Sequence, residues 1–137
     1  MKIYVGQRKI DSEQYKTILD PTLINLMCED AEAEAIILDG VIRRHFMKDV
    51  PEIIAMCHKK LRTKGILKII DIDFDLLSST YVKRANIADL NNIFTTEIRS
   101  FMTYEFLHTW IHQNFPDLKD HGANLFGVEF DLELIRE

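Results

Sequence analysis

Apolar and polar positions follow one another along the chain in blocks that predict strands and helices in turn. Residues 35–38 form a short apolar run that ends at Asp39-Gly40, and residues 66–70 form a second run that ends in acidic residues. Between them, apolar residues recur at helical spacing over 53–61, with Gly65 placed to follow the end of a helix. This pattern predicts a strand–helix–strand unit, which is the building block of a parallel sheet.

The same patterns predict the remaining elements of the chain. Apolar runs closed by turn residues predict strands over 2–6, over 15–19 and, as a pair joined at Gly127, over 123–135. Helical spacing predicts helices over 75–83, 89–94 and 104–114, the last capped by Thr103. Residues 24–27 fit either a weak strand or one turn of helix.

The order of these elements predicts an α/β fold built as one domain over 1–137. The sheet should be mostly parallel, with an antiparallel hairpin at the carboxyl terminus. Parallel crossovers are almost always right-handed, so we expect helices on both faces of the sheet.

Composition narrows the possible partners and compartment. Apolar residues make up 47% of the chain and charged residues 28%, with a net charge of −5, which argues against sequence-independent binding of nucleic-acid phosphates. No apolar stretch approaches the roughly 20 residues of a membrane span. Cys28 and Cys57 are far apart and lack metal-ligand spacing, which favours buried thiols in a reducing cytoplasm.

Three segments carry a resemblance to a known family. They are KIYVG at 2–6, ILDGVIRRHF at 37–46 and KLRTKGILKI at 60–69. They resemble the class I S-adenosylmethionine-dependent methyltransferases, and in particular a small subgroup with a brief connection between the first two strands. The resemblance implies a Rossmann-like methyltransferase fold and S-adenosylmethionine as cofactor.

The resemblance also implies five cofactor-binding residues. Gly6 stands in the glycine loop after the first strand, and Asp20 ends the second strand, where an acid accepts hydrogen bonds from the ribose hydroxyls. Asp30 corresponds to an acid near the adenine amine. Asp39 and Gly40 lie at the tip of the next strand, where Asp39 could orient an amine or the cofactor. Asp20 before a proline and Asp39-Gly40 are also ordinary turn residues.

The chain departs from the family pattern at several positions. The first loop keeps one glycine and continues with Arg8 and Lys9, whose side chains would crowd the cofactor unless they point outward. Arg44 replaces the glutamate that precedes the family's histidine, here His45, and Lys64 replaces a glycine.

Other polar residues are suited to acid–base catalysis or metal binding, but their spacing does not identify a specific site. Asp71 and Asp73 share one face of a strand and suit acid–base work or a metal, although acids at the end of a strand are more commonly plain surface residues. His108 and His112, four apart on a helix, permit two metal ligands, but the sequence identifies no third. We therefore assign neither a metal site nor a catalytic residue.

Two functional hypotheses follow. The first is a small S-adenosylmethionine-dependent methyltransferase whose acceptor is unknown. The second is a catalytically silent module of the same fold that acts in protein interaction or assembly. In either case we expect a protein partner or a second copy of the chain.

Overall fold

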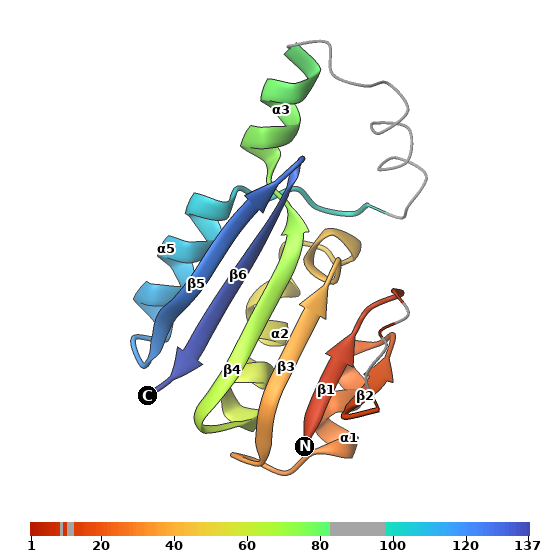
Figure 1. Cartoon of the computed structure of the whole chain (residues 1–137), viewed down its shortest axis with the longest axis vertical. Helices are drawn as coiled ribbons and strands as arrows, with labels where there is room; N and C mark the ends of the chain where they lie inside the picture. Colours follow the sequence, from red (N-terminus) through yellow and green to blue (C-terminus); the bar gives the residue numbers. More distant parts are fainter. Residues whose placement is uncertain (9, 11–12, 83–97) are drawn as a thin grey trace.

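The computed structural model describes residues 1–8, 10, 13–82 and 98–137, and these build a single six-stranded sheet (Figure 1). Strand order is β2-β1-β3-β4-β6-β5. The strands are β1 (Lys2–Val5), β2 (Tyr15–Ile18), β3 (Ala33–Asp39), β4 (Leu61–Ile72), β5 (Leu118–Phe126) and β6 (Glu129–Arg136). The first four are parallel, whereas β6 runs antiparallel to both β4 and β5. The predicted mixed sheet with a terminal antiparallel hairpin is therefore confirmed.

The helical elements connect these strands. They are η1 (Pro21–Leu23), α1 (Ile24–Met27), η2 (Ile42–Arg44), α2 (Val50–Lys60), α3 (Phe74–Val82) and α5 (Tyr104–Asn114). Residues 24–27 form the helical turn rather than a strand. The helix predicted over 89–94 lies outside the described residues. None of the described helices has the length and apolar character needed to cross a membrane.

One face of the sheet carries the helices. Figure 1 shows α1, α2 and α5 together behind the sheet, and their buried residues join one core cluster with strand residues, for example Ile24, Ile54 and Leu107 against Leu67. On the opposite face, half-buried side chains such as Ile66 alternate with the buried ones of β4. Within the described residues, the expected helices on both faces are thus found on one.

The end of α2 differs from the prediction. The helix stops at Lys60, and β4 begins at once with Leu61, which pairs with Ala33 of β3. Gly65 lies inside β4, where an added Cβ would come 2.8 Å from the Arg62 carbonyl oxygen and 2.9 Å from that of Ala33. Gly65 is therefore required by close strand packing rather than as a helix terminus, and the left-handed backbone falls on Lys64 (φ 67°).

Candidate cofactor site at the carboxyl edge of the sheet

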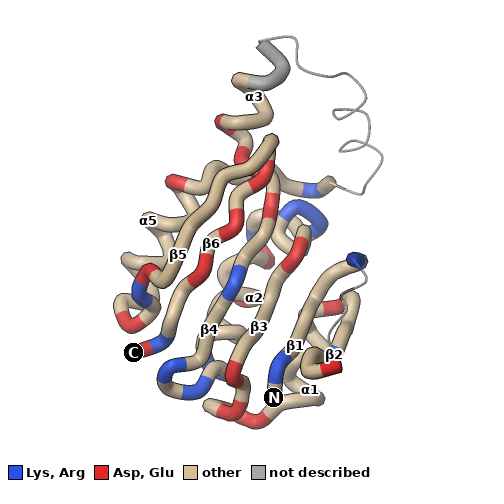
Figure 2. The backbone as a smooth tube through the Cα atoms, in the orientation of Figure 1, with Lys and Arg blue, Asp and Glu red and all other residues tan. Residues whose placement is uncertain are grey.

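Acidic residues lie at the carboxyl ends of the neighbouring parallel strands β3 and β4, at one edge of the sheet (Figure 2). Asp39 ends β3 and is only 6% exposed. Its Oδ2 accepts a hydrogen bond from the Tyr4 hydroxyl at 2.5 Å and lies 3.3 Å from Arg8 Nε. Asp39 is therefore a buried carboxylate held by β1 and by the loop that follows it.

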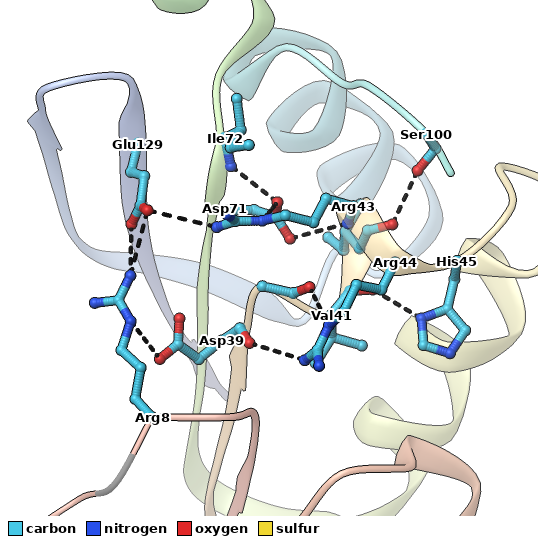
Figure 3. A network of polar contacts seen from close by, with 12 residues as sticks. Arg8, Asp39, Val41, Arg43, Arg44, His45, Asp71, Ile72, Ser100 and Glu129 are labelled. Carbon is cyan, nitrogen blue, oxygen red and sulfur yellow. Dashed lines mark hydrogen bonds and ion pairs between the residues drawn. The ribbon is translucent and has the colours of Figure 1, made fainter. Parts of the chain in front are cut away.

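A chain of ion pairs extends from Asp39 across this edge, as Figure 3 shows. Arg8 donates from Nη2 to Glu129 at 3.0 Å, and Glu129 lies 3.6 Å from Arg43 Nη2. Arg43 in turn donates from Nε to Asp71 at 2.9 Å. The network joins the first loop, η2, β4 and the start of β6. It therefore links segments that are far apart in the sequence along this edge of the sheet.

Sequence reasoning missed Glu129 and Arg43. The pairing of Ile72 with Glu129 places the first residue of β6 beside the end of β4. That placement depends on strand order, which local periodicity does not contain. The one available signal was a charged residue directly after the turn at Gly127.

Burial and pairing set the ionisation of these groups. Burial raises the pKa of Asp71, and Arg43 opposes that rise. Burial also raises the pKa of the Tyr4 hydroxyl, and its hydrogen bond to Asp39 adds to the rise. For Arg8, burial acts to lower the pKa, but Asp39 and Glu129 outweigh it and the pKa is raised. Tyr4 therefore stays a neutral hydrogen-bond donor to Asp39.

Arg44 explains one departure from the family pattern. Its guanidinium donates to the backbone carbonyls of Gly40 at 2.9 Å and Asp39 at 3.3 Å, which secures the turn after β3 (Figure 3). A glutamate at this position has no proton to donate to those oxygens. His45 Nδ1 lies 2.8 Å from the Val41 carbonyl oxygen and so also belongs to this turn.

The two predicted glycines lie on either side of Asp39. An added Cβ at Gly6 would come 2.9 Å from the Tyr4 hydroxyl and 3.0 Å from Asp39 Cβ, so the chain's own packing requires a glycine there. Gly40 has φ +69°, the left-handed conformation that glycine favours in a turn. The structure brings Gly6, Asp39 and Gly40 together.

Asp20 lies after β2 and begins η1. Its Oδ1 accepts from the Thr22 backbone nitrogen at 2.9 Å and from the Thr22 hydroxyl at 2.8 Å. The backbone bond is the main reason that the pKa of Asp20 is lowered, and His45 contributes through its charge. Asp20 is therefore an exposed, ionised cap of η1.

A cavity of about 330 Å³ opens next to the residues that follow Asp20, between η1 and α1 on one side and α2 with the segment leading into it on the other. Its lining residues are Pro21, Thr22, Asn25, His45, Asp49, Glu52, Ile53 and Met56. The lining mixes an apolar wall with several hydrogen-bonding groups, which suits a flat, polar-edged ring.

Two other acids singled out from the sequence, Asp30 and Asp73, do not join this site. Asp30 precedes β3 at the opposite, amino-terminal edge of the sheet, where it lies 3.0 Å from Lys60 Nζ and 3.5 Å from Lys59 Nζ. It is not brought together with Asp39. Asp73 accepts from the backbone nitrogens of Asp75 and Tyr104, so it ties the starts of α3 and α5 to the end of β4.

The fold is that of S-adenosylmethionine-dependent methyltransferases. A methyltransferase of this class from Archaeoglobus fulgidus superposes with a TM-score of 0.58 at 9% identity, over 92% of this chain and 70% of that one. An O-methyltransferase family protein from Burkholderia thailandensis gives 0.61 at 13%, over 90% and 36%. An O-methyltransferase family 2 protein from Planctomyces limnophilus, in complex with apigenin, gives 0.56 at 18%, over 90% and 34%. The chain thus spans about a third of the two O-methyltransferases.

No protein-family model and no curated protein matches the chain by sequence. The likeness therefore lies in the arrangement of the strands and helices.

Proposed function

We propose that this chain binds S-adenosylmethionine, or a relative with the same adenosine part, at the carboxyl edge and acts as a small methyltransferase. The observation that carries the proposal is the 330 Å³ cavity beside Asp20 in a sheet with the methyltransferase arrangement. In open α/β sheets, ligands bind outside the carboxyl ends of the strands.

The cavity fits the nucleoside end of such a ligand. Asp20, which is hydrogen-bonded to the lining residue Thr22, supplies a carboxylate that can accept from two ribose hydroxyls. Asn25 and Thr22 offer amide and hydroxyl groups for the edge of a base, while Ile53 and Met56 supply apolar surface for its face.

The amino-acid end requires one side chain to move. Arg8 now pairs with Asp39, but its side chain is 56% exposed and can rotate outward. In that position its guanidinium would bind the ligand carboxylate, and Asp39 would accept from the ligand ammonium group. Arg8 and Asp39 thus carry charges complementary to the carboxylate and ammonium groups at the amino-acid end of the ligand.

Methyl transfer requires few further chemical groups from the protein. The bound cofactor supplies a methyl group on a sulfonium, and the protein contributes position and exclusion of water. The acceptor would come from a protein partner or a second copy, because the described residues form a compact sheet with short connections. Two buried free thiols, Cys28 and Cys57, suit the cytoplasm as its compartment.

Calorimetric titration with S-adenosylhomocysteine tests the proposal. Saturable binding of one equivalent is expected for the unmodified chain, together with a raised melting temperature. Asp20→Ala should weaken binding at least about tenfold, because losing the ribose hydrogen bonds costs more than about 1.4 kcal/mol. The matched control is Asp30→Asn, which alters an acid at the opposite edge and should leave affinity unchanged.

A second ligand separates the two ends of the site. 5′-Methylthioadenosine carries the nucleoside without the amino acid, so it should bind more weakly than S-adenosylhomocysteine. Arg8→Gln should reduce that difference. If neither ligand binds at millimolar concentration, the cofactor proposal fails.

The second candidate is the catalytically silent module, favoured by one observation. Gly6, Asp20 and Asp39 already satisfy contacts within the chain that do not need a ligand. We propose this role, with a partner protein or second copy, for the case in which both titrations show no binding.

A further inference from the structure

Three potential metal ligands converge at the edge of the sheet, away from the candidate cofactor site. His108 and His112 lie one turn apart on α5, and Asp120 lies on the edge strand β5. Asp120 Oδ1 is 2.9 Å from Nε2 of His108 and 2.9 Å from Nε2 of His112. The two Nε2 atoms are 3.1 Å apart. Three ligand atoms from two elements therefore form a triangle about 3 Å on each side.

Helix geometry and a strand irregularity create the triangle. Residues four apart on a helix lie on one face, which brings both imidazoles toward β5. Asp120 pairs with Leu134 of β6 and so shares the face that packs against α5. The register of β5 shifts between Asp120 and Gly122, and such a bulge re-aims the side chains beside it.

Protons alone cannot satisfy this arrangement. A neutral imidazole nitrogen carries either one proton or one lone pair, and it points in one direction. If both Nε2 atoms carry protons, both N–H groups point at Asp120 and the two donor nitrogens are crowded together at 3.1 Å. If one carries a lone pair, that lone pair faces a carboxylate oxygen at 2.9 Å. One of the three contacts is repulsive in either case.

A cation at the centre makes all three contacts favourable. Tetrahedral zinc binds imidazole nitrogen and carboxylate oxygen at about 2.0–2.2 Å, which sets its ligand atoms about 3.3–3.5 Å apart. The triangle needs to expand by only a few tenths of an ångström. His108, His112 and Asp120 are 29%, 28% and 57% exposed, so a metal ion can reach them from solvent.

We propose that His108, His112 and Asp120 form a binding site for one divalent transition-metal ion of the zinc class. Two imidazoles and one carboxylate select such ions over Mg²⁺ and Ca²⁺, which prefer oxygen ligands. The three protein ligands leave a fourth position for water, as in open zinc sites. Tyr104, stacked on the His108 ring, shields one side of that ligand.

The bound ion would join the last helix to the edge strand. Along the chain, the two elements are joined by the short segment 115–117, and both contribute residues to the core. An ion that binds the folded chain and not the unfolded one raises stability. The site would therefore stabilise the sheet at β5, which is the terminal strand of the sheet that the described residues form.

Metal titration of the untagged, chelator-treated protein tests this site. One equivalent of Zn²⁺ should bind and raise the melting temperature, whereas Mg²⁺ should do neither. Co²⁺ should bind at the same stoichiometry and show the intense visible absorption of tetrahedral coordination, which Zn²⁺ should then abolish by displacement. These measurements are independent of any methyltransferase activity.

Ligand variants identify the residues. His112→Gln and Asp120→Asn should each weaken Zn²⁺ binding by about 100-fold or more, since even outer-shell partners contribute about 10- to 100-fold. The matched control is His121→Gln, which changes the adjacent histidine paired with Glu133 and should leave Zn²⁺ affinity unchanged. All of these side chains are at least partly exposed, so the variants should fold. Zn²⁺ affinity that is equal in all variants, or no Zn²⁺ binding at micromolar concentration, would overturn the proposal.

Discussion

The carboxylate of Asp71 is almost completely buried, since only 2% of the residue is exposed to solvent. It accepts hydrogen bonds from the Arg43 side chain at 2.9 Å and from the Ile72 backbone nitrogen at 2.8 Å. A buried charge of this kind is tolerable only while its partner remains. At the residue scale, the stability of the carboxyl edge therefore depends on this pair.

Arg43→Met should lower the free energy of unfolding by about 3–5 kcal/mol at pH 8, because it leaves a buried carboxylate without its cation. Burial already raises the pKa of Asp71, and losing Arg43 should raise it further. The folded state then binds a proton that the unfolded state releases, so stability falls as pH rises above the unfolded pKa. The loss should be smaller at pH 5 than at pH 8 in urea unfolding experiments.

The double variant Arg43→Met with Asp71→Asn provides the control. It removes the charge and keeps one oxygen, which can accept one of the two backbone hydrogen bonds that Asp71 receives through Oδ2 from residue 43 and through Oδ1 from residue 72. It should recover part of the stability and remove the pH dependence over this range. A deficit of Arg43→Met that is equal at both pH values would contradict this account.

At the element scale, α5 shows how a local signal fixes a helix boundary. Thr103 has extended backbone and accepts from the Phe106 nitrogen at 3.1 Å, as the sequence predicts for a cap. Thr103→Ala should reduce the free energy of unfolding by about 1 kcal/mol, within the range of 0.5–2 kcal/mol for lost caps. Thr109→Ala, an exposed site inside the same helix, should be neutral or slightly stabilising. Urea denaturation measures both, and equal losses would show that the cap contributes nothing specific.

Local patterns predicted most strands and helices but not every boundary. Cys57 and Leu61 stand four apart, so the helical pattern runs on into residues that the structure uses for a strand. Leu61 is instead drawn into β4 by pairing with Ala33, a contact distant in sequence. The boundary is thus set by the sheet and could not be read from periodicity.

The residues of the candidate sites likewise include some that local sequence patterns predict and others that depend on long-range packing. The ends of β1, β2 and β3 were predictable, because apolar runs stop at Gly6, Asp20 and Asp39. Asp120 was not, because its approach to His108 depends on how the last helix packs against the edge strand and on a register shift within it. A pair of histidines four apart, followed by an acid shortly before the strand predicted from residue 123, was the signal available.

At the scale of the whole molecule, one hydrophobic core joins the helices to the sheet. Cys57 of α2 lies in this core, so the reactivity of its thiol measures how often the core opens. The residue is fully buried, and burial raises the pKa of its thiol to about 12. At pH 8 only about one molecule in ten thousand would carry the reactive thiolate, even if reagent could enter. In a Cys28→Ser variant, modification of Cys57 by a disulfide reagent should therefore require unfolding of the core.

The rate of that modification should rise exponentially with urea, with the slope of global unfolding, because no smaller opening exposes the inner side of α2. The same protein in concentrated denaturant should react at once, which controls for the chemistry of the reagent. Rapid stoichiometric labelling without urea would mean that α2 separates from the sheet on its own. In that case the wall of the cavity formed by Ile53 and Met56 would also be lost, and the candidate cofactor site would exist only part of the time.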